Sequence, residues 1–243
     1  MYEERPPGPD LAGRVACVWH QVSESDTTHL VVPDACVDLI WGPEGLFVAG
    51  PDTGPMPTPM AAGDTFVGIR FKPGVAGDVF GVPIPELRDQ RVPLSALPGV
   101  PGLPDLQIDG SGAPELSRPE RRLEAMRAAV KRRLTRSDAA DPAAPTIART
   151  LMAGRTVTEV AWDLGFSDRQ LHRRTVAAFG YAPKTLQRIV RFQRALRLAR
   201  AGMPLAEVAA TSGYTDQSHL SHDVKRLSGV PMGRLVSPVR EPA

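Results

Sequence analysis

Residues 159–168 read EVAWDLGFSD, and residues 207–216 read EVAATSGYTD. The pattern Glu-Val-Ala followed by Gly, an aromatic residue, Ser or Thr, and Asp therefore recurs after 48 residues. Three further anchors keep the same order in both copies: Leu171 and Leu220, Gly180 and Gly229, Pro183 and Pro231. Such self-similarity indicates that one supersecondary unit is present twice.

Each copy predicts a helix, a tight turn and a second helix. Thr156 and Glu159 form a capping-box signature at the start of the first helix. Gly165 ends this helix, because glycine enters the left-handed conformation without a Cβ penalty. Ser167 then caps the second helix, with Gln170 at its third position. The second copy repeats this logic with Val208, Ala209, Gly213, Thr215 and Leu220.

This geometry leaves the outward face of each second helix free to enter a DNA major groove. The base-reading residues predicted on the first such helix are Arg169, Gln170, His172, Arg173 and Arg174. Those predicted on the second are Gln217, Ser218, His219, Ser221 and His222. Arg and Gln carry donors and acceptors that match guanine and adenine edges. A solvent-facing polar surface explains any single residue equally well, but two matched faces in a duplicated unit favour DNA readout.

A long basic helix is predicted between the two units, from Pro183 to Ala201, with Gly202 and Pro204 ending it. Its apolar positions are Leu186, Ile189, Val190, Ala195 and Leu198, and its arginines are Arg188, Arg191, Arg194, Arg197 and Arg200. A rigid connecting helix suits successive major-groove faces about 34 Å apart. The arginines are candidates for phosphate contacts, and a solvated or interdomain face is equally consistent with each.

Charge is distributed unevenly along the 243 residues. Residues 1–116 carry a formal charge of −10 and the rest of the chain +12, although the whole chain carries only +2. A basic C-terminal half is the electrostatic footprint of a phosphate-binding domain, and on charge alone a solvated basic face accounts for it as well.

The N-terminal part is predicted to be β-rich. Short apolar runs broken by Gly and Pro cover residues 15–22, 30–32, 37–41, 46–49 and 65–71. Residues 42–45, Gly-Pro-Glu-Gly, predict a hairpin turn between two of these runs. Residues 50–63 contain four prolines and are predicted to be a surface loop, because proline does not fit a central strand.

Helical spacing begins at Ser117, where Leu123, Met126, Val130 and Leu134 indicate one amphipathic helix over about 117–136. Residues 137–145 have linker composition, although Asp141-Pro142 also fits the start of a helix running toward Met152. The predicted division is a β-rich sensor or dimerisation domain at 1–116, a helix and linker at 117–144, and a DNA-binding domain at 145–237.

The duplicated turns, Gly-Phe-Ser-Asp and Gly-Tyr-Thr-Asp-Gln-Ser-His-Leu, resemble those of the AraC family of bacterial transcription regulators, over roughly residues 145–235. The resemblance implies an α+β protein of two domains, in which an all-α domain with two helix-turn-helix units follows a β-rich domain. It implies neither catalysis nor a cofactor. Family members usually carry an aromatic core residue where this chain has Thr175 and Val224, and an arginine is common in place of His222.

Residues 32–41 and 68–74 resemble an amino-terminal domain of some actinobacterial-type AraC regulators, whose role is generally unassigned. The resemblance implies a β-rich, cupin-like fold that in the wider family binds a small effector or mediates dimerisation. A small-molecule sensor is the preferred interpretation, and a ligand-free dimerisation or partner-binding module is the main alternative. A pocket in the β-rich domain, lined by apolar residues and a few polar groups, would favour the sensor, and a flat exposed apolar patch the alternative.

Potential metal ligands of the N-terminal part are His20, His29, Asp34, Cys36 and Asp38, of which the last three would share one face of a strand. No His-x-His or Cys-x-x-Cys pair accompanies them, so ordinary strand polarity is the preferred interpretation and no metal is predicted. A redox pair of Cys17 and Cys36 has equally little support.

Some AraC-type proteins carry a cysteine methyltransferase of alkylation repair, which makes an enzyme the remaining alternative. Neither cysteine of this chain has the Pro-Cys-His setting or a neighbouring base that would activate a thiolate. We therefore expect a cytoplasmic DNA-binding transcription regulator that is not an enzyme and has no membrane span. Its expected partners are a promoter or operator in double-stranded DNA, a small effector, a second copy in a homodimer, and RNA polymerase if it is an activator.

Overall fold

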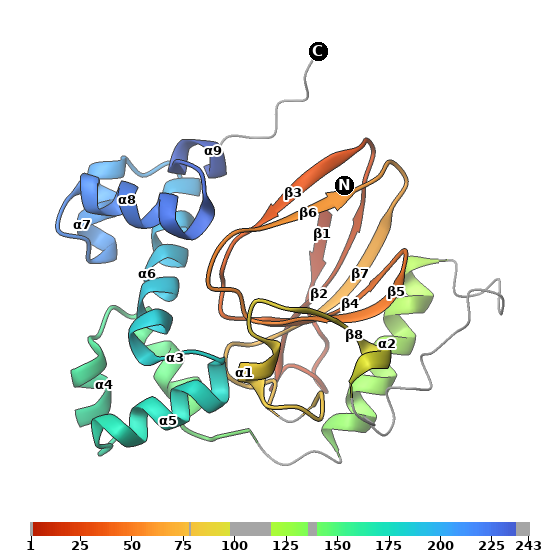
Figure 1. The fold of residues 1–243 in the computed structure, drawn as a ribbon, viewed down its shortest axis with the longest axis horizontal. Coiled ribbons are helices and arrows are strands. Elements are labelled where there is room, and N and C mark those ends of the chain that lie inside the picture. Colours follow the sequence, from red (N-terminus) through yellow and green to blue (C-terminus); the bar gives the residue numbers. More distant parts are fainter. Residues whose placement is uncertain (1, 78, 98–117, 136–139, 237–243) are drawn as a thin grey trace.

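The computed structural model describes residues 2–77, 79–97, 118–135 and 140–236, and Figure 1 shows the arrangement of its elements. The strands are β1 (Tyr2–Arg5), β2 (Val15–Val22), β3 (Thr27–Val31), β4 (Val37–Gly42), β5 (Gly45–Ala49), β6 (Met56–Met60), β7 (Thr65–Phe71) and β8 (Arg91–Pro93). The helices are α1 (Ile84–Leu87), η1 (Leu94–Ala96), α2 (Pro119–Leu134), α3 (Ala144–Met152), α4 (Val157–Asp163), α5 (Asp168–Phe179), α6 (Pro183–Arg200), α7 (Leu205–Ser212), α8 (Gln217–Ser228) and α9 (Met232–Val236). A β-rich part is thus followed by a helical part, as the sequence predicts.

The main sheet is antiparallel and has the strand order β1-β2-β7-β4-β5-β8. The predicted hairpin is confirmed, because β4 and β5 pair up to Gly42 opposite Gly45. Gly68 in β7 lies beneath the indole ring of Trp19 on β2, where an added Cβ would stand 2.2 Å from a ring carbon. A side chain at this position of the sheet would therefore displace Trp19.

One face of this sheet forms the core of the N-terminal part. Leu39 and Ile69 of the sheet pack with Met126 and Val130 of α2, all fully buried. The amphipathic helix expected around 117–136 therefore covers the sheet in the structure, where it lies along one side in Figure 1. Its predicted first residue, Ser117, lies outside the described residues, and Pro119 occupies its first turn.

The prediction of a loop over the whole of residues 50–63 is wrong at β6. Met56–Met60 forms a strand that pairs antiparallel with β3 in a separate two-stranded sheet. Pro57 and Pro59 both lie in it and are exposed. A strand that is paired along one edge tolerates residues without an N–H donor, since its other edge requires none. The sequence argument correctly excluded a central strand and overlooked an edge strand.

The helical part begins with α3, so the alternative of a helix running toward Met152 is confirmed. A side-chain oxygen of Asp141 accepts a hydrogen bond from the backbone N–H of Ala143 at 2.9 Å, at the entry to this helix. Residues 137–139 of the predicted linker lie outside the described residues. Among the described residues, no helix is long and apolar enough to cross a membrane.

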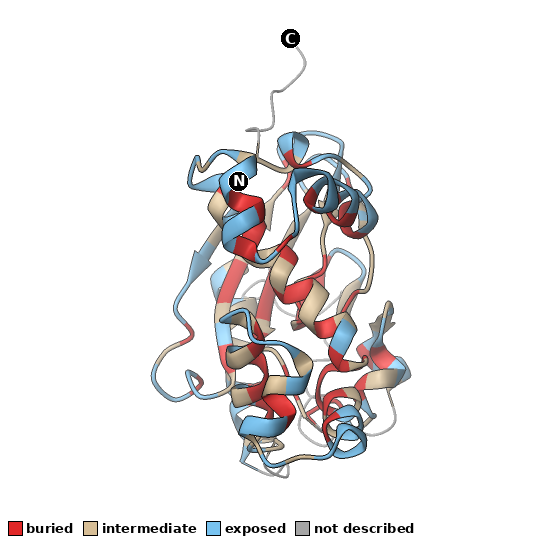
Figure 2. Cartoon of the chain, turned by 90° about the vertical axis from the view of Figure 1, so that its left-hand side faces the viewer, coloured by how far each residue is buried: buried red, intermediate tan, exposed pale blue. Residues whose placement is uncertain are grey.

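Helix α6 is the centre of the helical core. Along its length Leu186, Ile189, Phe192 and Leu196 are buried, and they pack with buried side chains from α3 to α9. Figure 2 views this side of the molecule and shows that its helices combine buried and exposed residues. The long helix predicted from Pro183 to Ala201 therefore connects the two units and also supplies much of their shared core.

Candidate nucleic-acid interface

The first helix-turn-helix unit consists of α4 and α5. The Thr156 hydroxyl accepts the N–H of Glu159 at 3.2 Å, and the Glu159 carboxylate accepts the N–H of Thr156 at 2.7 Å. Gly165 then adopts φ +65°, the left-handed conformation expected for the turn. Ser167 and Gln170 form a second capping box at the start of α5. All these predictions are confirmed, and the caps fix where α5 begins.

The second unit, α7 and α8, repeats the turn and differs in its caps. Gly213 adopts φ +79°. The residue that caps α8 is Asp216, whose carboxylate accepts the N–H of His219 at 2.7 Å. The expectation that Thr215 caps this helix is therefore wrong by one residue. A carboxylate beside the positive helix N-terminus gains from both the hydrogen bond and the dipole.

In the core of each unit, a smaller residue fills the position where an aromatic residue is usual in the family. Thr175 and Val224 are both fully buried, with 0% of their surface exposed. The Thr175 hydroxyl donates to the backbone oxygen of Leu171 at 2.7 Å, so its polar atom is satisfied inside the core. Leu171 and Leu220 point inward as predicted. Each unit therefore holds its second helix on a small but filled core.

The predicted base-reading residues of α5 fall into two groups. Arg169, His172 and Arg173 are exposed on the outward face. Gln170 is also exposed, but its side-chain oxygen accepts the Ser167 N–H at 2.8 Å and serves the cap. Arg174 is only partly exposed and pairs with Asp141, which lies before α3.

The predicted residues of α8 are all exposed: Gln217, Ser218, His219, Ser221 and His222. The ring of His219 stands edge-on to that of Tyr214, with centroids 5.2 Å apart. Its Nδ1 lies 3.4 Å from the hydroxyl of Thr215. This imidazole therefore packs on the turn, while the other four side chains project from the helix without such a contact among the described residues.

The same arginine arrangement occurs in both units and was not predicted. The guanidinium of Arg174 lies 4.8 Å from the ring centroid of Phe166 and binds both carboxylate oxygens of Asp141, at 2.7 and 2.8 Å. A planar guanidinium is suited both to stacking on an aromatic face and to paired hydrogen bonds with a carboxylate. Arg174 thus fastens the turn of the first unit to the segment before α3.

In the second unit the corresponding contact comes from α6. The guanidinium of Arg191 lies 4.2 Å from the ring centroid of Tyr214 and pairs with Asp223 of α8 at 3.3 Å. The Tyr214 hydroxyl donates to the same carboxylate at 3.1 Å, and burial is the largest cause of its raised pKa. Arg191 was a candidate for a phosphate contact, but this arginine holds α6 against the second unit.

The helical part contacts the N-terminal part at several points. The Gln193 amide of α6 donates to the backbone oxygen of Pro33 at 2.6 Å, and Arg88 donates to that of Gly180 at 3.2 Å. Ala35, in the loop between β3 and β4, is buried in the helical core. Figure 1 shows α1 of the N-terminal part beside α5. Helix α5 of the first unit is therefore in contact with the β-rich part.

A partly buried ion-pair cluster adjoins the loop that makes this contact. Arg70 of β7 pairs with Asp38 at 3.1 Å and lies 3.7 Å from Asp34. Burial raises the pKa of Asp38 to about 6 against the opposing effect of Arg70, and Asp34 adds to the increase. Ala35 adopts φ +66°, so the expected strand alternation from Asp34 to Asp38 is interrupted. The carboxylates of Asp34 and Asp38 both lie near the guanidinium of Arg70 instead.

Neither cysteine is disulfide-bonded. Burial raises the pKa of the Cys17 thiol to about 11, and that of Cys36 well above its usual value, which disfavours a nucleophilic thiolate in each case. Among the described residues, no group of three or more His, Cys, Asp and Glu side chains is placed to hold a metal ion. His20 lies on β2 and His29 on β3, in different sheets.

Two families match separate parts of the chain. Residues 167–236 match a family described as a helix-turn-helix domain. The C-terminal part is an AraC-type DNA-binding domain. The match begins at the cap of α5, so α4 is placed in the first unit by the internal repeat and by the structure. Residues 3–93 match a domain of unknown function, DUF6597.

Solved structures of ToxT from Vibrio cholerae are similar to this chain over 90–96% of its length, at low sequence identity. A single-residue variant of apo ToxT has 10% identity and a TM-score of 0.47, over 90% of this chain and 96% of that one. A ToxT structure at 1.65 Å resolution has 11% identity and a TM-score of 0.46, over 96% and 97%. A third, bound to an unsaturated fatty acid, has 9% identity and a TM-score of 0.43, over 90% and 93%. No curated protein matches the chain.

Proposed function

We propose that this chain regulates transcription by placing α5 and α8 in two successive major grooves of one promoter or operator. The observation that supports this most strongly is the structural repeat. Two units with the same glycine turn present exposed polar helix faces, and α6 runs through the core that they share. A fixed spacing between recognition helices matches successive grooves of one duplex.

The two recognition helices are chemically unequal. Helix α5 presents Arg169 and Arg173, whereas α8 presents Gln217, two serines and His222. Arginine offers a permanent charge and paired donors to guanine, which a neutral imidazole does not. We therefore expect α5 to dominate affinity, and α8 to refine register and specificity.

We also propose that the N-terminal domain modulates DNA binding through a small effector. Direct hydrogen bonds from Arg88 and Gln193 join that domain to the helical part, so a change in it has a route to α5 and α6. Among the described residues, the exposed large apolar side chains are Tyr2 and Trp162, which lie in different parts of the molecule. These two separate side chains give no support to a broad apolar docking patch on the described surface. We therefore keep the sensor, and not the partner-binding module, as the preferred interpretation. A homodimer and a contact with RNA polymerase remain predictions.

The proposal is tested by selecting DNA bound by the full chain from a random duplex library at moderate salt. The expected result is an enriched sequence with two short blocks centred about 10 base pairs apart. Retention of all sequences with equal efficiency would overturn sequence-specific binding. A single enriched block would overturn the use of both helices.

A further inference from the structure

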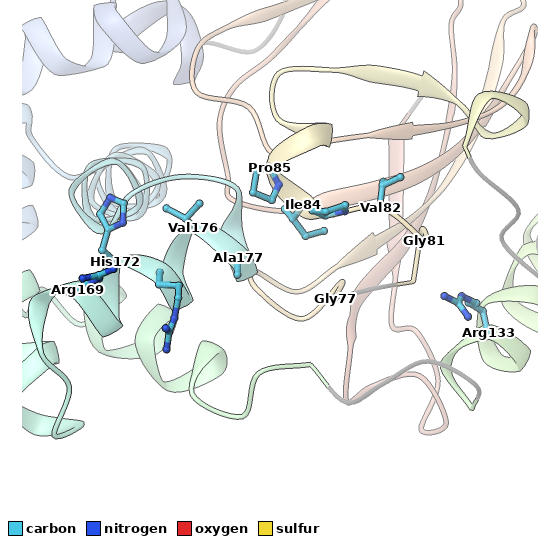
Figure 3. A pocket seen from close by; sticks show the side chains of 12 residues that line it. Gly77, Gly81, Val82, Ile84, Pro85, Arg133, Arg169, His172, Val176 and Ala177 are labelled. Carbon is cyan, nitrogen blue, oxygen red and sulfur yellow. The ribbon is translucent and has the colours of Figure 1, made fainter.

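The two recognition helices are supported by different parts of the molecule. Val176 of α5 lines one hollow together with Ile84 and Pro85 of the N-terminal domain, so α5 lies beside that domain (Figure 3). Helix α8 packs mainly on α6, α7 and α9, which all belong to the helical part. The direction in which α8 projects therefore depends chiefly on its contacts within the helical part.

An ion pair reaches each recognition helix at the same position. Arg174 of α5 and Asp223 of α8 both stand three residues after the inward-pointing leucine of their helix. Arg174 pairs with Asp141, which lies before α3. In α8 the charges are exchanged, and Asp223 pairs with Arg191 of α6. The second pair thus holds α8 against the helix that connects the two units.

The contact at Asp223 joins three elements at one guanidinium. Arg191 of α6 stacks on the ring of Tyr214 in the turn, 4.2 Å from its centroid, and its Nη2 lies 3.3 Å from the Asp223 carboxylate. Its Nη1 lies 3.5 Å from the backbone oxygen of Gly213. The Tyr214 hydroxyl donates to the same carboxylate at 3.1 Å. Because a guanidinium is planar and its donors point in fixed directions, few orientations of α8 relative to α6 satisfy these contacts together.

This contact is a better source of direction than of stability. Only 8% of the Asp223 side chain is exposed, so its charge has lost most of its hydration. The Nε of Arg191 is also buried, and it has no acceptor among the described residues. A buried ion pair with an unmet donor recovers little of this cost, and an apolar pair of similar volume is often as stable. An apolar pair would lack the fixed directions of the hydrogen bonds.

We propose that Arg191 and Asp223 are positioning residues that determine specificity without contacting DNA. Their contact fixes the orientation of α8 relative to α6, and with it the number of base pairs that the chain requires between the two blocks of its DNA. The statement about DNA rests on the proposed function, whereas the fixed orientation of α8 does not.

The variant that separates direction from stability combines Arg191→Met with Asp223→Leu and is called the apolar variant. Its urea midpoint is expected to stay within about 0.3 M of wild type, whereas Arg191→Met alone leaves a buried carboxylate unpaired and should lower the midpoint by about 1 M. Equal losses in the two variants would show that the contact contributes stability rather than direction. If the apolar variant does not fold, Arg191→Lys replaces it, because lysine keeps the charge without the planar donors.

The matched control combines Arg155→Met with Asp163→Leu. These two residues form an ion pair at 3.0 Å in the first unit, and both are about half exposed. The change in composition and charge is the same, but this pair does not join α6 to a recognition helix. It should leave the orientation of α8 as it is in wild type.

The orientation of α8 is measured without DNA, by the distance between two spin labels. The labels are attached to Arg197→Cys of α6 and Lys225→Cys of α8, both at exposed positions, after Cys17→Ser and Cys36→Ala remove the native thiols. The distribution of distances is expected to be at least about twofold wider in the apolar variant than in wild type or the control. Equal widths would overturn the positioning role, whether or not the chain binds DNA.

The effect on DNA is measured with the two selected blocks moved one base pair closer or farther apart. Wild type and the control are expected to lose at least about fivefold in affinity, and the apolar variant less than about twofold relative to its own affinity at the original spacing. The same loss in all three would overturn the inference and leave the proposed function intact. A wild-type chain that selects no pair of blocks would overturn the proposed function, and the label distances would then decide the positioning role alone.

Discussion

At the residue scale, spacing along a helix did not separate arginines with different roles. Arg173 and Arg174 are adjacent, and both were predicted to read bases. The structure leaves Arg173 exposed and joins Arg174 to Asp141, 33 residues earlier in the chain. A partner so distant leaves no local pattern, so Arg174 was indistinguishable from a surface residue. The exposed positions, in contrast, followed directly from the helical period.

Replacing Arg173 by Ala is expected to weaken binding to the selected DNA by about 1–3 kcal/mol and to relax preference at one base position, if its contact is bidentate. Fluorescence anisotropy and a repeated selection measure the two effects. Arg121→Ala, at an exposed position on α2, is the control and should change neither. An unaltered selected sequence would remove Arg173 from the reading residues.

Replacing Arg174 by Ala is expected to act differently, by lowering stability. The change leaves the half-buried Asp141 without its ion pair and Phe166 without its stacked guanidinium. Part of this side chain is exposed, so we expect a loss of about 1–2 kcal/mol in the free energy of unfolding, measured by urea titration. Unchanged stability together with an altered base preference would show that Arg174 contacts bases, as the sequence predicted.

Asp38 is expected to make stability depend on pH. Its pKa is about 6 in the folded chain and about 4 in an unfolded one, so the folded state binds the proton more tightly. The contribution of this group to stability is therefore largest below about pH 4 and is lost as pH rises to about 6. Over that window wild type should lose up to about 3 kcal/mol more than Asp38→Asn. Parallel curves for the two proteins would contradict the raised pKa.

At the element scale, helices with local start and stop signals were predictable, and the exceptions have identifiable causes. Both units, their glycine turns and two of the three predicted N-cap residues, Thr156 and Ser167, follow from neighbouring residues. Strand β6 was missed because its prolines argue against a strand unless its neighbours are known, and only the fold reveals that it pairs with β3 alone. The packing of α2 on the sheet is likewise a long-range outcome that its amphipathic pattern did not specify.

The cap of α8 gives a direct test at this scale. Asp216→Ala is expected to lower the free energy of unfolding by about 1 kcal/mol, because the His219 N–H loses its acceptor. Thr215→Ala is the matched control at the neighbouring position and should cost only a few tenths of a kcal/mol. Urea unfolding measures both. A larger loss for Thr215→Ala would show that Thr215 holds the cap.

At the scale of the whole molecule, the junction between the domains could not be predicted from the sequence. Gln193 and Pro33 are 160 residues apart, and their hydrogen bond has no sequence signal. The charge difference between the two halves was consistent with a phosphate-binding C-terminal part or with a solvated basic face, and it did not indicate that the N-terminal domain lies against α5. The contacts between them were therefore visible only in the structure.

The junction is tested at Gly74. This residue has φ +74°, and an added Cβ would stand 2.5 Å from the ring of Phe179 at the end of α5. Gly74→Ala is expected to push the domains apart there and to lower the thermal midpoint by several degrees. Gly63→Ala is the matched control, with φ +86° and nothing within 4 Å of the added atom. Equal losses in both variants would mean that backbone strain alone is responsible.

The proposal of two recognition helices at a fixed separation is tested most directly by inserting five base pairs between the two blocks of the selected DNA. The insertion turns the second block by about half a helical turn, away from the face that α8 reaches from α6. The expected affinity of the full chain is that of DNA carrying one block alone, at least about tenfold weaker than for the original spacing. Undiminished affinity for the DNA with the insertion would contradict two recognition helices held at a fixed separation.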